Sequence, residues 1–248
     1  MTTTLKIIVT FFTYVITTSC SSESPMTESG TTPTPTNHAL QIPSRSETIN
    51  YLALGDSYTI GESVCETCRF PEQLKTALKN LNFQNNFSLD IIARTGWTTT
   101  NLISAIESNK PTEKYDLVTL LIGVNNQYQN ISFSIYEKEF PELVTKAISL
   151  VKGDKNKLIV VSIPDYAYTP FGQNYGNPST ISSEIDRYNA FAKSYCEAYA
   201  ISYINITDIT RQGLNNTGLV ANDGLHPSKE AYSLFVQRLL PKAVALLQ

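Results

Sequence analysis

The chain has 248 residues, of which 42% are hydrophobic and 17% are charged, and its formal net charge is −3. These values are ordinary for a folded globular protein. No run of basic residues occurs, so we expect no nucleic-acid partner, and the mild acidity identifies no ligand.

The first twenty residues predict an export signal. Lys6 precedes an apolar segment that runs from Ile7 to Ile16. A membrane-spanning helix needs about 20 apolar residues, so this shorter segment is typical of a cleaved signal peptide. Cys20 follows in the sequence TTSCSS, which resembles the cleavage site of a bacterial lipoprotein.

That resemblance implies that Cys20 becomes the first mature residue and carries a lipid. Thr17 departs from the pattern, because lipoprotein signals usually have an aliphatic residue there. The alternative is an ordinary secretory signal with an incidental cysteine. We expect residues 1–20 to be a lipoprotein-type signal peptide. The exported protein would then be lipid-anchored in the bacterial cell envelope, at the outer membrane or facing the periplasm.

Residues 21–48 predict a flexible tether. The segment is rich in Ser, Thr, Pro and Glu and has no apolar periodicity. Such a composition cannot bury enough surface to offset the entropy lost on ordering. His38 lies in this segment, and we interpret it as a solvated residue without a function.

From residue 49 onward, short apolar runs alternate with segments of helical periodicity. The runs are rich in β-branched residues and nearly continuous, as expected for strands buried on both faces of a sheet. They are INYLAL (49–54), SLDIIA (88–93), DLVTLLI (116–122), KLIVVSI (157–163) and SYINI (202–206). Apolar residues at helical spacing predict helices near 74–81, 143–151, 180–200 and 228–247.

This alternation predicts an α/β fold. We expect a three-layer α/β/α sandwich with a five-stranded parallel sheet and helices on both faces. Residues 49–248 are enough for one domain. Ligands of such folds bind beyond the carboxyl ends of the strands, so the residues that directly follow the strands are the candidates for a site.

Four residues with useful chemistry follow four of these strands. They are Ser57, Gly96, Asn125 and His226, after the first, second, third and fifth strands. A serine hydroxyl becomes a good nucleophile only when a base takes its proton, and His226 is the only histidine of the predicted domain. Asp223, three residues earlier, is placed to accept from the imidazole across one helical turn.

Attack by Ser57 on an ester would create an oxyanion. The backbone N–H groups of Ser57 and Gly96 and the side-chain amide of Asn125 are candidate donors to it. Gly96 is expected at the start of a helix that follows the second strand, and a glycine there allows the backbone to approach closely. These residues together predict acyl transfer through a Ser57–His226–Asp223 triad.

Four sequence blocks resemble those of the SGNH, or GDSL, hydrolase family. They are GDS (55–57), Gly96, GVNN (123–126) and DGLH (223–226), in family order and each after a predicted strand. The resemblance implies a flavodoxin-like SGNH hydrolase fold, and it assigns Ser57 as nucleophile, His226 as base, Asp223 as its orienting partner, and Gly96 and Asn125 as oxyanion donors. Each residue alone also has a structural explanation, such as a helix cap or a turn, but those explanations leave the shared placement unexplained.

Two positions depart from the family pattern. Asn126 stands where the family usually has an aspartate, so we expect a local change in hydrogen bonding. Tyr58 stands where the family has leucine, which places a bulky ring beside the nucleophile. Asp56 is expected to be structural and to bind amides of its turn.

The sequence CETC (65–68) lies between the predicted nucleophile and the next helix. A zinc site needs about four ligands, and no second cysteine pair or nearby histidine is available. In an exported protein we expect a local disulfide between Cys65 and Cys68, and no bound metal or cofactor. Cys196 falls in a predicted helix and is expected to be a buried free thiol.

Several aromatic rings follow the fourth strand, in PDYAYTPFGQNYG (164–176): Tyr166, Tyr168, Phe171 and Tyr175. They predict either an aromatic wall for an acyl chain or a sugar ring, or a loop that packs its own rings onto the domain.

We therefore predict a lipid-anchored serine esterase of the lipase, lysophospholipase or arylesterase kind. Its substrate would be a small-molecule, lipid or glycan ester, and we expect a monomer. One alternative is a carbohydrate O-deacetylase. The other is a non-catalytic glycan-binding lipoprotein of the same fold, against which an intact set of Ser57, Asp223 and His226 argues.

Overall fold

The computed structural model describes residues 48–81, 86–111 and 115–248. The predicted export signal, the lipidation site Cys20 and the predicted tether up to residue 47, with His38, lie outside the described residues.

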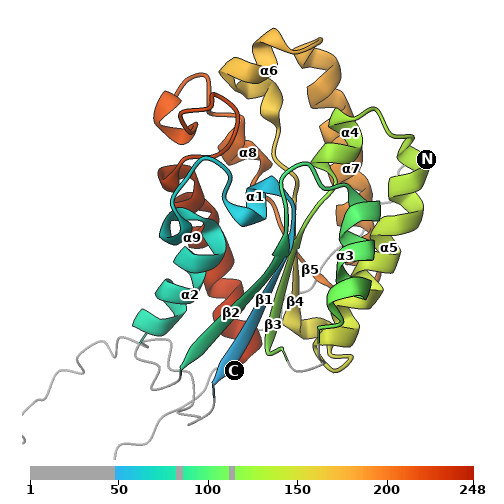
Figure 1. Cartoon of the computed structure of the whole chain (residues 1–248), viewed down its shortest axis with the longest axis vertical. Helices are drawn as coiled ribbons and strands as arrows, with labels where there is room; N and C mark the ends of the chain where they lie inside the picture. Colours follow the sequence, from blue (N-terminus) through green and yellow to red (C-terminus); the bar gives the residue numbers. More distant parts are fainter. Residues whose placement is uncertain (1–47, 82–85, 112–114) are drawn as a thin grey trace, which may run out of the picture. The chain divides into compact units, whose positions relative to one another are not determined.

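A five-stranded parallel sheet forms the centre of the described domain, in the order β2-β1-β3-β4-β5 (Figure 1). The strands are β1 (Ile49–Gly55), β2 (Phe87–Ala93), β3 (Leu117–Leu121), β4 (Leu158–Val161) and β5 (Ser202–Ile204). Each coincides with one of the predicted apolar runs, and the predicted α/β fold is confirmed. β3 and β4 are buried throughout because helices cover both faces, whereas the edge strands β2 and β5 are mostly half-buried.

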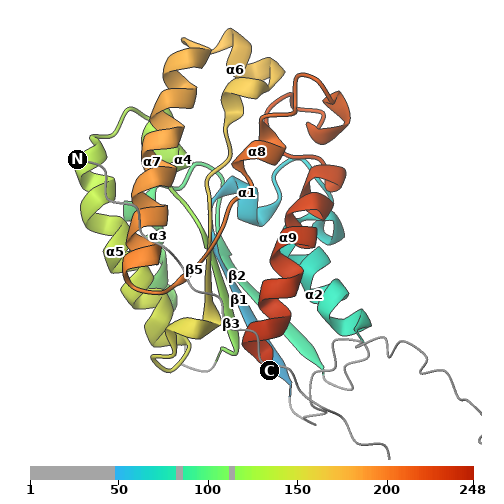
Figure 2. The same cartoon turned by 180° about the vertical axis from the view of Figure 1, so that it is seen from behind.

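The long helices form two layers around the sheet. The helices α2 (Phe70–Asn80) and α9 (Lys229–Leu247) pack together on one face, as Figures 1 and 2 show. The other face carries α3 (Thr99–Asn109), α5 (Phe133–Leu150) and α7 (Pro178–Ala198). None of the helices in the described segments has both the length and the apolar character needed to cross a membrane.

Short helices occupy the loops. They are α1 (Ser57–Ile60), α4 (Val124–Tyr128), α6 (Pro170–Asn174) and α8 (Thr207–Thr210), with the 3-10 helices η1 (Glu66–Cys68), η2 (Lys155–Lys157), η3 (Tyr166–Tyr168) and η4 (Thr217–Leu219).

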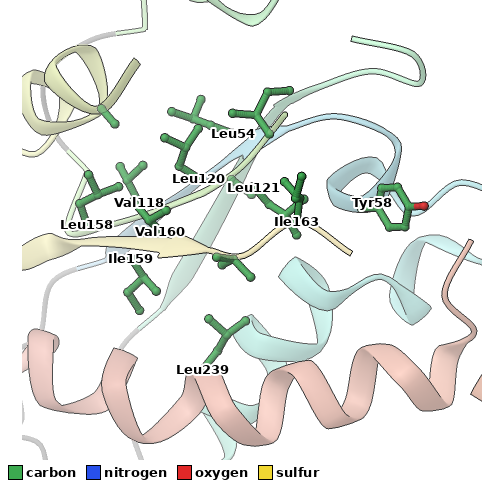
Figure 3. Close-up of a cluster of buried hydrophobic side chains, with 14 of the residues drawn as sticks. Leu54, Tyr58, Val118, Leu120, Leu121, Leu158, Ile159, Val160, Ile163 and Leu239 are labelled. Carbon is green, nitrogen blue, oxygen red and sulfur yellow. The ribbon is translucent and has the colours of Figure 1, made fainter. Parts of the chain in front are cut away.

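The core lies between the sheet and each helical layer. Successive residues of a strand point to opposite faces, so Leu158 and Ile159 of β4 enter different layers, and Leu239 of α9 lies on the side of Ile159 (Figure 3). All three side chains are fully buried. Burial of side chains of this size stabilises the fold by about 1.5–3 kcal/mol each, which holds the helices against the sheet.

The register aligns the carboxyl ends of the central strands. Gly55, the last residue of β1, pairs with Ala93 at the end of β2 and with Leu121 at the end of β3. The loops that follow these three strands therefore leave the sheet at one edge, and this edge carries the candidate site.

Candidate active site

The turn from β1 into α1 holds Ser57 at the carboxyl edge of the sheet. Ser57 is the first residue of α1 and is buried, and its N–H has no acceptor within the helix. Gly55 lets α1 and the end of β3 pack closely against the turn. A Cβ at this position would collide with the Thr59 hydroxyl and the Leu121 carbonyl oxygen. A larger residue at position 55 would therefore displace the serine.

Asp56 caps α1, because its Oδ1 accepts a hydrogen bond from the backbone N–H of Tyr58 at 3.0 Å. This contact is the structural role expected from the sequence. The side chain is fully buried, and its Oδ2 has no hydrogen-bond partner among the described residues. Burial raises the pKa of the Asp56 carboxyl to about 7, although hydrogen bonds to the backbone lower it in part.

The turn before α9 joins Asp223 to His226. Oδ2 of Asp223 lies 2.6 Å from Nδ1 of His226, and Oδ1 accepts from the backbone N–H groups of Leu225 at 2.9 Å and His226 at 3.0 Å. We predicted one helical turn here, but the residues form a tight turn in which Gly224 has φ of 74°. Glycine adopts this backbone readily, so Gly224 allows the turn that brings the Asp223 carboxylate to Nδ1 of His226.

The electrostatics favour an ionised Asp223. Partial burial acts to raise the pKa of its carboxyl. The hydrogen bonds from Ser63, His226 and two backbone N–H groups outweigh burial and lower the pKa to about 2. A carboxylate that stays charged at neutral pH can stabilise a positive charge on the His226 ring.

Ser57 and His226 line one cavity of about 220 Å³. Within the described segments, no hydrogen bond joins the Ser57 hydroxyl to the His226 ring; such contacts are often long before a substrate binds. The ring of Tyr58, buried beside Ser57, lies 5.1 Å from the His226 ring at an angle of 52°. The tyrosine that replaces the family leucine therefore packs against the histidine.

Gly96 and Asn125 line the same cavity. Gly96 has φ of 82°, and no atom lies within 4 Å of where a Cβ would be, so its backbone borders open space. It lies in a turn three residues before α3, whereas we predicted it at the start of that helix. The amide of Asn125 donates to the carbonyl oxygen of Trp97 at 3.0 Å, and a second N–H on the same nitrogen is available for a ligand.

Asn126 lies outside the cavity and fixes the start of α3. It is fully buried, its Oδ1 accepts from the backbone N–H of Thr99 at 3.0 Å, and its Nδ2 donates to the Thr99 hydroxyl at 2.7 Å. The same hydroxyl donates to Glu139 of α5 at 2.5 Å. An asparagine thus supplies the donor that an aspartate lacks.

Several further residues line the cavity without having been predicted from the sequence: Thr95, Val124, Tyr128 and Leu225. Tyr128 lies three residues after Asn125 on α4, and this spacing places both on one face of a helix. The sequence therefore contained a signal for Tyr128, whereas Leu225 and Thr95 have no comparable pattern.

The aromatic segment after β4 fits both interpretations derived from its sequence. Tyr166 and Phe171 line the cavity, as a wall would. Tyr175 stacks on Phe171, with ring centres 5.4 Å apart, and on Tyr128 at 4.8 Å, so the rings also pack on one another. Tyr168 does not line the cavity, and Arg211 lies over its ring at 5.9 Å.

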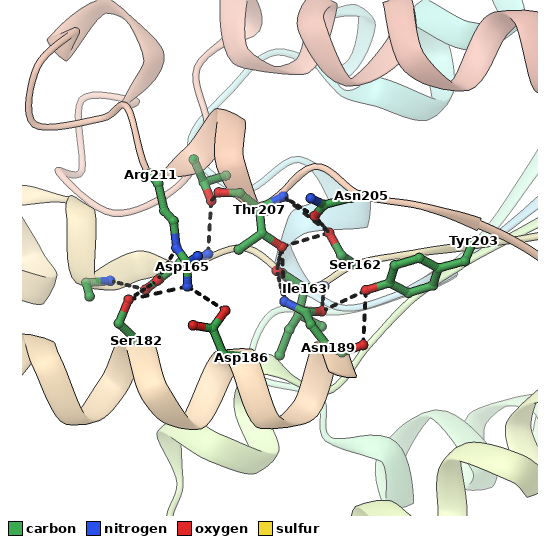
Figure 4. A network of polar contacts seen from close by, with 12 residues as sticks. Ser162, Ile163, Asp165, Ser182, Asp186, Asn189, Tyr203, Asn205, Thr207 and Arg211 are labelled. Atoms are coloured by element: carbon green, nitrogen blue, oxygen red, sulfur yellow. Dashed lines mark hydrogen bonds and ion pairs between the residues drawn. The ribbon is translucent and has the colours of Figure 1, made fainter. Parts of the chain in front are cut away.

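A polar network holds this aromatic segment in place (Figure 4). Asp165, fully buried, accepts from the backbone N–H of Ala167 at 3.0 Å and from Nε of Arg211 at 2.9 Å. It also accepts from Ser182 of α7, and Arg211 contacts Asp186 of α7 at 2.7 Å. The neighbour of Tyr166 is therefore anchored to both α7 and the end of α8.

The described residues include three cysteines, at positions 65, 68 and 196. Cys65 and Cys68 form a disulfide, and Cys196 of α7 is a buried free thiol. Across residues 48–81, 86–111 and 115–248, no three His, Cys, Asp or Glu side chains are grouped so that they could hold a metal ion.

The comparisons with known proteins agree with this geometry. The chain matches the GDSL-like lipase/acylhydrolase family over residues 53–234, which is more than half of its length. No curated protein matches the sequence. Among solved structures, the fold is similar to a lipase/acylhydrolase from Enterococcus faecalis, with a TM-score of 0.63 and 20% identity over 81% of this chain and 97% of that one.

Two further structures show the same fold. One is a member of the lipolytic G-D-S-L family from Veillonella parvula, with a TM-score of 0.59 and 18% identity over 78% of this chain and 97% of that one. The other is an acetylxylan esterase from Geobacillus stearothermophilus, with a TM-score of 0.57 and 18% identity over 79% and 94%. Because the family match covers residues 53–234, which include every residue of the candidate site, the chain belongs to the GDSL-like lipase/acylhydrolase family and is a hydrolase of ester bonds.

Proposed function

We propose that this protein cleaves carboxylic esters through an acyl-enzyme intermediate on Ser57. The observation that carries the proposal is the 2.6 Å hydrogen bond between Asp223 and His226 at the cavity that Ser57 also lines. Asp223 fixes the ring so that Nδ1 carries hydrogen and Nε2 acts as the base.

In the first half of the reaction, His226 Nε2 takes the proton of Ser57 while Oγ attacks the ester carbonyl carbon. The carbonyl oxygen becomes an oxyanion, which accepts hydrogen bonds from the N–H groups of Ser57 and Gly96 and from the amide of Asn125. The intermediate then collapses, the bond to the alcohol oxygen breaks, and His226 returns the proton to the departing alcohol. In the second half, water replaces the alcohol and the same steps release the acid.

The size of the cavity supports short acyl groups. At about 220 Å³ the cavity is smaller than the roughly 300–1,000 Å³ typical of small-molecule pockets. Its walls are mostly aromatic or aliphatic, with Tyr58, Val124, Tyr128, Phe171 and Leu225 around the polar set. We propose acyl chains of a few carbons as the preferred substrates, rather than long lipid chains.

Carbohydrate O-deacetylation is the second candidate, and the position of Tyr175 favours it. This ring stacks on Phe171 of the cavity wall and is 37% exposed, so its exposed part can contact a sugar ring beside the cleaved acetyl group. On this proposal Tyr175→Ala raises KM for acetylated xylan and leaves KM for p-nitrophenyl acetate unchanged.

The test combines a probe of the nucleophile with a substrate series. A fluorophosphonate should label Ser57 in the wild-type protein and leave Ser57→Ala unlabelled. The kcat/KM for p-nitrophenyl esters should fall from acetate to octanoate, with lysophospholipid a poor substrate. Labelling at another residue would refute the triad, and a maximum at octanoate would refute the short-chain preference.

We further propose that the enzyme is exported and attached to the bacterial cell envelope by a lipid on Cys20, as a monomer. The short apolar segment before Cys20 and the Ser/Thr/Pro-rich segment after it support this location. A tether would let the catalytic domain reach substrates at some distance from the membrane.

A further inference from the structure

The segment between α1 and α2, residues 61–69, has no place in the mechanism above. We call it the disulfide loop, because it contains the Cys65–Cys68 bond. It begins at Gly61, the left-handed C-cap of α1, and ends at Arg69, directly before α2. It therefore connects the helix that starts with Ser57 to the helix that packs on α9.

Ser63 of this loop contacts Asp223, which lies 160 residues later in the sequence. Its hydroxyl donates to Oδ2 of Asp223 at 2.7 Å. This is the oxygen that lies 2.6 Å from Nδ1 of His226, while Oδ1 is already bound by two backbone N–H groups. Ser63 is thus the one side chain besides His226 that hydrogen bonds to Asp223 within the described part of the chain.

The backbone of Ser63 shows that the contact comes at a conformational cost. Ser63 has φ of 65°, in the left-handed region that glycine adopts freely and other residues rarely do. Glycine would suit the backbone better, so the side chain is what serine contributes here. Its hydroxyl donates to a carboxylate whose side chain is 28% exposed.

The disulfide restrains the loop close to Ser63. Cys65 follows Ser63 by two residues, and the N–H of Cys68 donates to the carbonyl oxygen of Cys65 at 2.8 Å. Nε2 of Gln73 then donates to the carbonyl oxygens of Cys68 at 2.5 Å and of Lys229, the first residue of α9, at 3.1 Å. The loop is therefore tied to the helix that follows the Asp223–His226 turn.

We propose that Ser63 is a positioning residue of the triad and that the Cys65–Cys68 disulfide holds its hydroxyl on Asp223. The second hydrogen bond on Oδ2 keeps the carboxylate from rotating away from the ring when His226 gains a proton during attack by Ser57. A loosened loop would let water replace the hydroxyl and would let the carboxylate turn. This inference rests on the triad of the proposed function.

Ser63→Gly is the sharpest test, because it removes the hydroxyl while it suits the left-handed backbone. We expect kcat for p-nitrophenyl acetate to fall about tenfold, as for a lost hydrogen bond to a charged group. KM should change by less than about twofold, since the substrate does not touch this residue. The melting temperature should not fall. Ser63→Ala should lose as much kcat, and Thr67→Ala, an exposed hydroxyl in the same loop, should behave as wild type.

Reduction of the disulfide tests the second half of the proposal. Dithiothreitol supplies two electrons and two protons, so Cys65 and Cys68 become thiols while the reagent becomes its own cyclic disulfide. Cys65 is exposed and open to the reagent, whereas Cys196 is a buried thiol already. We expect reduction to lower the kcat of the wild type, and to leave the already lowered kcat of Ser63→Gly unchanged, because the two changes act through one contact.

The outcomes separate this inference from the proposed function. If the wild type hydrolyses esters and Ser63→Gly keeps its full kcat, Ser63 has no positioning role and the triad stands. If reduction lowers the kcat of both proteins by the same factor, the disulfide does not act through Ser63. If the wild type neither reacts with the fluorophosphonate nor cleaves esters, the triad itself is wrong and this inference falls with it.

Discussion

The side-chain amide of Asn125 donates to the carbonyl oxygen of Trp97 at 3.0 Å, and this contact fixes the plane of the amide at the edge of the cavity. Trp97 directly follows Gly96, so two of the three proposed oxyanion donors, Gly96 and Asn125, lie on loops that contact each other. An amide fixed before the reaction needs no reorganisation when charge develops on the substrate.

Asn125→Ala should therefore lower kcat and spare KM. Loss of one oxyanion donor costs about 2.7–4 kcal/mol, or about 100- to 1,000-fold in kcat. The ground-state carbonyl depends less on this donor, so KM should barely move. Asn125→Asp should be at least as damaging, because it sets a negative charge against the oxyanion. A raised KM with normal kcat would instead assign Asn125 to substrate binding.

Asn126→Asp, which restores the residue usual in the family, should keep kcat within a few-fold of wild type but destabilise the fold. The buried carboxylate would lose the donor to the Thr99 hydroxyl and compete with Glu139 for the one hydrogen of that hydroxyl. A buried polar group left unsatisfied costs about 1–3 kcal/mol, measurable by denaturant unfolding. Adding Glu139→Gln should recover part of the loss, and equal stability of wild type and Asn126→Asp would contradict this account.

Asp56 should make the stability of the protein depend on pH. Its pKa is raised from 3.8 to about 7, so the folded state keeps a proton that the unfolded state loses between these values. The contribution of Asp56 to stability is therefore largest below pH 4 and declines as pH rises to about 7, by at most on the order of 4 kcal/mol.

Asp56→Asn retains the oxygen that accepts from Tyr58 and removes the titration. Its melting temperature relative to wild type should rise between pH 4 and pH 8 and then stay level. A constant difference across that range would mean that Asp56 is ionised throughout.

Arg211→Met should loosen the cavity wall. It leaves the buried carboxylate of Asp165 without its cation, which costs about 3 kcal/mol in a buried pair. Because Asp165 precedes Tyr166, the preference for acyl length should change as well. Arg238→Met is the matched control, since its partner Asp208 is exposed and such surface pairs contribute about 1 kcal/mol or less. Equal losses in the two variants would contradict a special role for Asp165.

Cys20→Ala should release the protein from membranes. The wild type, expressed with its full sequence, should fractionate with the envelope and carry a lipid on Cys20 detectable by mass spectrometry. The variant should be recovered in soluble fractions with unchanged kcat, because the change lies far from residue 57 in the sequence. A wild-type protein that is wholly soluble after export would refute the anchor.

The sequence predicted the sheet well because its central strands are buried on both faces. A strand such as β4 must be apolar at every position, and LIVV has no other ready explanation. The start of α5 was harder to predict from the sequence. We predicted this helix from residue 143, but it begins at Phe133 and continues through Pro141, a residue that usually predicts an interruption.

The residues of the candidate site also fall into those that the sequence predicted and those that only the structure revealed. Residues that follow strands were found because the register of a parallel sheet brings its loops to one edge. The contacts of Asp165 with Arg211 and of Ser63 with Asp223 join residues far apart in the sequence, and no local pattern specifies them. Each side chain alone resembles an ordinary surface residue, so only the folded chain identifies its partner.

The placement of Ser57 directly after β1 and of Asp223 and His226 directly before α9 has a consequence for biogenesis. The proposed nucleophile and its proposed base are separated by most of the domain's sequence, and the last helix, α9, packs against α2 near the beginning of the domain. On the proposed mechanism, a chain that is still being synthesised should not hydrolyse esters until its final helix has packed against α2. Ester turnover then reports completion of folding, and the cell is protected from the enzyme while it is being made.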